Sequence, residues 1–127
     1  MEGTEKQVKW AEDIKVTMIT CLENKLIAAN KKFGDVEMPE KSKKVFNLGL
    51  DFIKEKLEEI KQQEKATWFI DRREHISRPT ILNERFKNKK YVDMDVVSLF
   101  GEDPNSLAAK SVKIMDKYAK NEYIELF

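Results

Sequence analysis

The sequence predicts an all-α fold: a compact helical bundle of about four to six helices, two of them long, in a single domain over residues 1–127. Two long segments carry apolar residues at intervals of three and four, which is the period of one helical face. Lys, Glu, Leu, Ile and Ala dominate the composition, and the chain contains only 4 Gly and 3 Pro, so intrinsic propensity also favours helices. With 41% apolar residues in a chain of 127, one packed core is expected.

The first long helix is predicted over about residues 5–33. Thr4 and Gln7 form a capping-box pattern at its start, in which each side chain accepts a hydrogen bond from the other residue's backbone N–H. Gly34 is a natural stop at its end. One continuous apolar stripe runs along this helix and consists of Ala11, Ile14, Met18, Leu22, Leu26, Ala29 and Phe33.

Other apolar residues of this first helix lie outside the stripe. Trp10, Cys21 and Ala28 flank it on one side and widen the apolar face. Val16 and Ile27 fall on the opposite face of the helix. Either another element covers that opposite face, or the face contacts a partner.

The second long helix is predicted over about residues 40–62, and Pro39 suits its first turn. Gly49 lies inside it, where glycine costs about 1 kcal/mol relative to alanine, so we expect another helix to approach closely there. A break is expected near residues 62–65, followed by a third helix that carries Trp68. The apolar stripe of the second helix consists of Phe46, Leu50, Ile53, Leu57 and Ile60.

The stretch ATWFIDRREH, residues 66–75, combines three adjacent large apolar residues with a charged cluster and the only histidine. Because successive residues on a helix are rotated by roughly 100°, Trp68, Phe69 and Ile70 cannot share one face and are packed on several sides. We therefore expect both Trp68 and Trp10 to be largely buried. A second interpretation stays open, although packing is the favoured one: Trp and Arg are enriched at binding hot spots, so this stretch is alternatively a recognition surface.

Shorter elements are predicted in the rest of the chain. Pro79 is expected to end the helix that carries Arg73. Residues 80–86 have the pattern of one or two helical turns, and residues 101–104 have the composition of a turn.

Residues 93–100 allow two interpretations, either a short helix capped by Asp93 or Asp95, or an extended segment. A last helix follows, with Asn105 or Ser106 as its N-cap. Its predicted apolar stripe consists of Leu107, Ile114 and Tyr118, with Ala108, Val112, Met115 and Ala119 beside them.

Charge is distributed unevenly along the chain, although 24 basic and 23 acidic residues leave a net charge of only +1. Residues 41–90 hold fourteen basic and eight acidic residues, and the basic excess peaks over residues 72–90. An acidic stretch, residues 93–103, follows it. The candidate partner-binding residues come from this junction and are Arg72, Arg73, Arg78, Arg85, Lys87, Lys89, Lys90, Asp93 and Asp95.

Three interpretations of the basic stretch stay open. It is a solvated face balanced by neighbouring acids, a site for a phosphate backbone, or part of a protein interface. Asp71 and Glu74 are expected to hold Arg72 and Arg73 in ion pairs. A net charge of +1 argues against a mimic of DNA that involves the whole protein.

The sequence predicts a non-enzyme without a cofactor or metal. His75 and Cys21 are the only histidine and cysteine, too few for a structural zinc site, and no glycine-rich phosphate loop is present. No apolar run approaches the roughly 18–20 residues of a membrane span. The polar first residues lack a signal-peptide pattern, and a single cysteine fits a reducing compartment, so a cytoplasmic location is expected.

Two blocks of the sequence, EKQVKWAEDIK at residues 5–15 and ATWFIDRR at residues 66–73, carry a resemblance. They are similar to a small uncharacterised module of bacterial, phage and mobile-element proteins, in which an EKQxxWAExI opening is paired with a WxIDxR segment. Arg72 departs from that pattern, which has a polar residue such as Asn at this position. The resemblance implies no activity. It implies that the two blocks pack together and that the chain has a mobile-element origin.

Small non-enzymatic chains of mobile elements often inhibit host defence, and anti-CRISPR proteins are among them. By this analogy we expect a binding protein that acts on a larger host protein or ribonucleoprotein. The alternative is a nucleic-acid-binding accessory protein that uses the basic stretch of residues 72–90.

Overall fold

The structure, a computed structural model, describes residues 1–76 and 94–126. In these residues the regular secondary structure is helical, and loops connect the helices. The all-α prediction is therefore confirmed. The elements in chain order are α1 (Glu5–Phe33), α2 (Glu40–Gln62), α3 (Ala66–Asp71), the 3₁₀ turn η1 (Arg73–His75), α4 (Val96–Leu99) and α5 (Leu107–Leu126).

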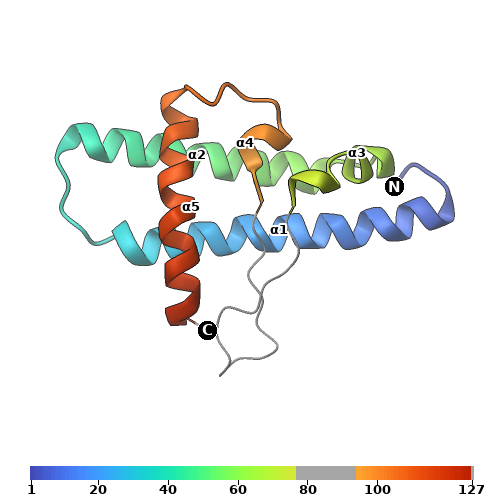
Figure 1. The fold of residues 1–127 in the computed structure, drawn as a ribbon, viewed down its shortest axis with the longest axis horizontal. Helices are drawn as coiled ribbons and strands as arrows, with labels where there is room; N and C mark the ends of the chain where they lie inside the picture. The colour runs from blue at the N-terminus through green and yellow to red at the C-terminus, as the bar shows by residue number, and fades with distance from the viewer. Residues whose placement is uncertain (77–93, 127) are drawn as a thin grey trace.

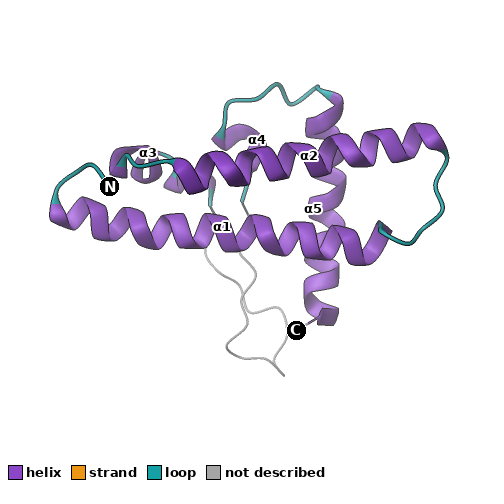
Figure 2. Cartoon of the chain, turned by 180° about the vertical axis from the view of Figure 1, so that it is seen from behind, coloured by secondary structure: helices purple, strands orange, loops and turns teal. Residues whose placement is uncertain are grey.

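α1 and α2 form an antiparallel hairpin, and α5 crosses one face of both (Figure 1). Seen from behind, α1 and α2 lie in front of α5, so the described helices cover the hairpin on one face only (Figure 2). α3 packs against the start of α1, which is the contact expected from the two resembling blocks. All four of these helices and α4 contribute to one hydrophobic core.

The ends of α1 and α2 follow the sequence signals. The Thr4 hydroxyl oxygen accepts a hydrogen bond from the Gln7 N–H at 3.2 Å, and the Gln7 carboxamide oxygen accepts one from the Thr4 N–H at 3.1 Å. α1 ends at Phe33 with Gly34 as its C-cap. α2 ends at Gln62, within the predicted break.

The segment between α2 and α3 is tied to the residues that precede α1. The Glu2 N–H donates to the Glu64 carbonyl at 2.6 Å, and the Ala66 N–H donates to the Glu2 carbonyl at 2.9 Å. The Lys15 ammonium also donates to the Gln63 carbonyl at 3.0 Å. These bonds fix α3 beside the first turns of α1.

α2 and α5 approach most closely at Gly49. A Cβ atom at this position would lie 2.6 Å from the Met115 methyl carbon and 2.9 Å from the Ser111 Cβ. Real Cβ atoms essentially never come so close to other atoms. The expectation that Gly49 permits a close helix approach is confirmed.

The apolar face predicted for α5 was partly wrong: Val112 and Met115 are buried as predicted, but Leu107 and Ile114 are not. The side chains of Tyr118 and Ala119 lie outside the described residues. Leu107 and Ile114 are 58% and 55% exposed, and the buried face consists of Ala109, Ser111, Val112 and Met115. The close crossing at Gly49 explains the difference, because it selects the face of α5 that carries small side chains rather than the one with the bulkiest apolar residues.

Within residues 93–100, the structure shows a short helix, α4, rather than an extended segment. Asp95 is the N-cap of α4, and its carboxylate accepts bonds from the Ser98 N–H at 3.1 Å and the Ser98 hydroxyl at 2.8 Å. Met94 is extended instead and forms an antiparallel bridge with Ile76. Ser106 caps α5 by accepting a bond from the Ala109 N–H at 3.1 Å.

Pro79 and residues 80–86 lie outside the described residues, as does Asp93. We expected the helix that carries Arg73 to continue as far as Pro79, and this expectation was wrong. α3 already ends at Asp71, and Arg73 belongs to η1.

Candidate functional site

α3 directs its three adjacent apolar residues to different surroundings, as predicted. Phe69 is fully buried in the core. Trp68 is partly buried, with its ring centroid 5.0 Å from that of Phe69 and 5.7 Å from that of Phe100, the residue that follows α4. Ile70 is partly buried against the same core. Trp68 thus joins α3 to α4 and is less buried than expected.

Two arginine side chains donate hydrogen bonds to carbonyl groups in the last turn of α3. The Arg72 Nη1 donates to the Trp68 carbonyl at 3.1 Å, and the Arg73 Nη1 donates to the Ile70 carbonyl at 2.6 Å. The last carbonyls of a helix lack intrahelical partners, and basic side chains at a helix C-terminus commonly bond them.

Each guanidinium also covers a tryptophan ring. The Cζ atom of Arg72 lies 4.2 Å from the Trp68 ring centroid, and the Cζ atom of Arg73 lies 4.9 Å from the Trp10 ring centroid. A cation within about 6 Å of a tryptophan face is attracted by the ring quadrupole. We call Trp10, Trp68, Arg72 and Arg73 the tryptophan–arginine surface.

The prediction that Asp71 and Glu74 form ion pairs with these arginines was wrong. Among the described residues, no ion pair joins Arg72 or Arg73 to Asp71 or Glu74. The Glu74 carboxylate instead lies 3.7 Å from the His75 Nε2. The helix carbonyls and the indole rings hold the guanidinium groups, so Asp71 and Glu74 stay exposed.

The expectation that Trp10 is largely buried was also wrong, because its side chain is 48% exposed. Trp10 flanks the stripe of α1 near the helix start, where α3 packs against α1. The exposed Arg73 lies over its ring. A guanidinium carries five N–H donors, and one of those of Arg73 bonds the Ile70 carbonyl, which leaves donors for a further acceptor.

Asp95 is placed near this surface through η1. The Asp95 N–H donates to the His75 carbonyl at 3.0 Å. Partial burial raises the pKa of Asp95, but the two hydrogen bonds from Ser98 and the charges of His75 and Lys113 outweigh it, so the pKa is lowered overall from 3.8. Asp95 is therefore a structural helix cap.

Of the nine candidate residues, the structure places three: Arg72, Arg73 and Asp95. The others fall outside the described residues and stay predictions: Arg78, Arg85, Lys87, Lys89, Lys90 and Asp93.

Among the described residues, sequence reasoning missed two buried lysines, Lys25 and Lys56. The Lys25 ammonium, on a side chain that is only 1% exposed, lies 2.8 Å from the Met94 carbonyl oxygen and 2.8 Å from an Asp116 carboxylate oxygen. Lys56 is buried too, and its ammonium lies 2.9 Å from the Glu102 carboxylate. Both lysines fall within the apolar stripes by helical phase, and that phase was the signal that could have revealed them.

Lys56 is linked to the tryptophan–arginine surface through Phe100. Its ammonium lies 4.9 Å from the Phe100 ring centroid, and Phe100 packs against Trp68. Burial lowers the pKa of Lys56, but the carboxylates of Glu102 and Glu59 outweigh burial and raise the pKa above its ordinary 10.5. Lys56 is thus held in the charged form.

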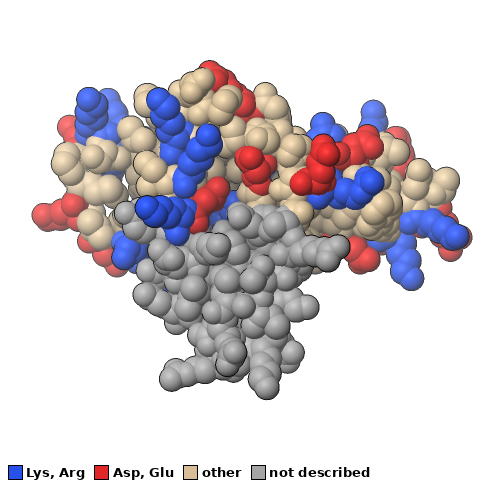
Figure 3. Space-filling view, viewed as in Figure 1, with Lys and Arg blue, Asp and Glu red and all other residues tan. Residues whose placement is uncertain are grey.

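The end of the molecule that carries α3 shows basic and acidic side chains side by side (Figure 3). The described residues contain no group of three or more His, Cys, Asp or Glu side chains placed to hold a metal. Within the described part of the chain, no helix has the length and apolar character needed to span a bilayer.

No protein-family model matches the chain, and neither the curated proteins nor the solved structures show a match to it.

Proposed function

We propose that this chain is a small non-enzymatic binding protein whose tryptophan–arginine surface contacts a larger protein partner. The observation that carries the proposal is the pair Trp10 and Arg73. An indole that is 48% exposed is covered by a guanidinium that is fixed to a helix carbonyl. Tryptophan and arginine dominate interface hot spots, and a side chain that is already fixed loses less entropy on binding.

The chemistry of the surface favours a protein with an exposed carboxylate next to an apolar group. The remaining N–H donors of Arg73 suit a carboxylate, and the open part of the Trp10 ring suits an aliphatic or aromatic side chain. A phosphate backbone is the less favoured ligand, because Asp71 and Glu74 are exposed beside the two arginines and offset their charge.

For the partner we propose a host-defence protein or ribonucleoprotein of the kind that anti-CRISPR proteins inhibit. The support is the resemblance of residues 5–15 and 66–73 to a mobile-element module. These two blocks contribute all four residues of the tryptophan–arginine surface.

The test is capture of partners from host lysate with the parent chain and with Trp10→Ala and Arg73→Gln. Each substitution should weaken capture of a given partner about 30-fold, the effect of a hot spot of about 2 kcal/mol. The matched control is Ile27→Ala, since Ile27 is 56% exposed on the opposite face of α1 and its loss should leave capture unchanged. Equal capture by all four proteins would refute the surface.

The nucleic-acid alternative is tested in the same series. We expect capture to survive nuclease treatment, and we expect only weak duplex DNA binding at physiological salt. If DNA binding is tight, the logarithm of the affinity should fall with that of the salt concentration by about 0.9 per neutralised phosphate. A lower slope after the four substitutions Arg85→Gln, Lys87→Gln, Lys89→Gln and Lys90→Gln would then show that the basic stretch is the site.

A further inference from the structure

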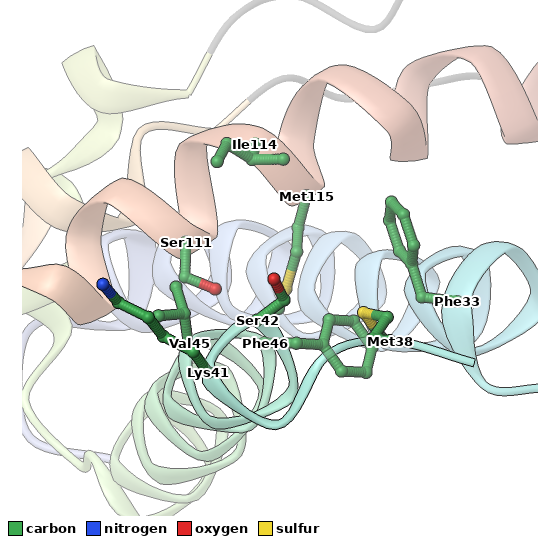
Figure 4. Close-up of a pocket in the computed structure, with 9 residues that line it drawn as sticks. All are labelled: Phe33, Met38, Lys41, Ser42, Val45, Phe46, Ser111, Ile114 and Met115. Atoms are coloured by element: carbon green, nitrogen blue, oxygen red, sulfur yellow. The ribbon is translucent and has the colours of Figure 1, made fainter. Parts of the chain in front are cut away.

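A pocket lies at the other end of the molecule, away from the tryptophan–arginine surface. It has a volume of about 350 Å³, is open to solvent on one side, and is lined by the end of α1, the loop before α2, the first half of α2, and α5 (Figure 4). Its apolar lining consists of Phe33, Met38, Val45, Phe46, Ile114 and Met115. Its polar lining consists of Lys41, Ser42 and Ser111.

The helix crossing at Gly49 produces this pocket. α2 and α5 approach most closely where Gly49 meets Ser111 and Met115, and two crossing helices separate on either side of their contact point. The space between them widens toward the start of α2. The rings of Phe33 and Phe46, whose centroids are 5.5 Å apart, form a further part of the wall.

The wall of the pocket includes an apolar side chain that the protein itself leaves uncovered. Ile114 is 55% exposed, although the sequence pattern places it on an apolar stripe of α5. Single exposed apolar residues are common, but apolar residues gathered around a concave site mark ligand-binding grooves. An occupant of the pocket would cover Ile114.

The polar groups of the pocket favour a negatively charged occupant. Lys41 is exposed at the edge of the pocket, and the hydroxyls of Ser42 and Ser111 point between α2 and α5 (Figure 4). Lys41 and Ser42 belong to the first turn of α2, a helix whose N-terminus has no side-chain cap. Backbone N–H groups at such an end add positive potential. Glu40 is the one acid in this first turn and does not line the pocket.

We propose that this pocket binds a small amphipathic carboxylate, with its apolar chain between α2 and α5 and its carboxylate at Lys41 and the Ser42 hydroxyl. The volume suits a small molecule, since ligand pockets occupy about 300–1,000 Å³. The single ammonium at the edge matches one carboxylate. This site is independent of the tryptophan–arginine surface and of the function proposed for it.

The experiment uses the full chain labelled with ¹³C on the methionine methyl groups and titrated with decanoate below its micelle-forming concentration. Met38 and Met115 line the pocket, whereas Met18 and Met94 are buried elsewhere in the core and serve as internal controls. We expect saturable shifts of the Met38 and Met115 signals only. The expected dissociation constant is on the order of 1 mM for so small a ligand.

Matched variants test the two halves of the site. Lys41→Gln should weaken decanoate binding about fivefold, while Lys44→Gln, an exposed lysine that does not line the pocket, should leave it unchanged. Ile114→Glu should weaken binding at least tenfold by placing a carboxylate against the ligand. Leu107→Glu is its control, because Leu107 is as exposed on the same helix and lies outside the lining.

Three results would overturn the proposal. The first is the absence of saturable shifts at Met38 and Met115. The second is equal binding of decanol and decanoate with no effect of Lys41→Gln, which would show an apolar groove without a carboxylate site. The third is a shift of these signals with protein concentration alone, which would show that a second copy of the chain covers the pocket. Circular dichroism of each variant confirms that it is folded.

Discussion

Replacing Lys25 by methionine tests how strongly the buried ion pair joins α1 to α5. The substitution keeps the length of the aliphatic chain but removes the ammonium that lies 2.8 Å from both the Met94 carbonyl oxygen and the Asp116 carboxylate. Removing one partner of a buried ion pair costs about 3–5 kcal/mol, because the other charge stays behind without its counterion.

The Asp116 side chain is 26% exposed and has an interaction besides the one with Lys25, so the lower end of this range applies. We expect Lys25→Met to lower the free energy of unfolding by about 3 kcal/mol, equivalent to about 10 °C in Tm for a chain of this size. The assay is urea unfolding followed by far-UV circular dichroism.

Lys9→Met is the control, because Lys9 is exposed on the same helix, and it should change stability by less than about 0.5 kcal/mol. Adding Asp116→Ala to Lys25→Met should restore part of the loss, since the buried carboxylate that faced the Lys25 ammonium is then gone. Two results would refute a strong contribution of the Lys25–Asp116 ion pair to stability. One is a loss of less than about 1 kcal/mol in the free energy of unfolding for Lys25→Met, and the other is no recovery in the double variant.

Three further predictions concern the packing and capping of the bundle. Gly49→Ala should destabilise the protein by about 1–3 kcal/mol through overpacking against α5, despite the better helix propensity of alanine, as measured by urea unfolding. Trp68→Ala should cost about 3 kcal/mol, because Trp68 packs against Phe69 and Phe100, and a thermal melt like that of the parent would make it a surface anchor instead. Asp95→Ala should cost about 1 kcal/mol at neutral pH through loss of the α4 cap. Because folding lowers the pKa of Asp95, its contribution is full above pH 3.8 and is lost as the pH falls through the folded value, so parent and variant should converge in acid.

The bounds of α1 and α2 were predictable because each helix carries a sustained stripe and clear end signals. The buried face of α5 was not, since it depends on Gly49, which is distant in sequence. A periodic pattern shows that a helix has a core-facing side, but the position of the crossing helix decides which side that is.

The candidate site was predictable in its residues but not in its contacts. Arg72 and Arg73 stood out by their charge beside Trp68, and sequence neighbours suggested ion pairs. The structure gives them helix carbonyls and indole rings instead, because α3 ends directly before them. Trp10 became part of the surface through the packing of α3 on α1, which the resemblance of residues 5–15 and 66–73 implied but no pattern within α1 reveals.

The crossing of α5 over the hairpin has a consequence for the order of folding. α1 and α2 are joined by a short loop, residues 34–39, so their contacts close at little cost in chain entropy. α5 must bring Ser111 to Gly49 and Asp116 to Lys25 across much larger sequence separations. We therefore expect the hairpin to form first and α5 to dock late, so that a substitution at Gly49 accelerates unfolding and leaves the folding rate nearly unchanged.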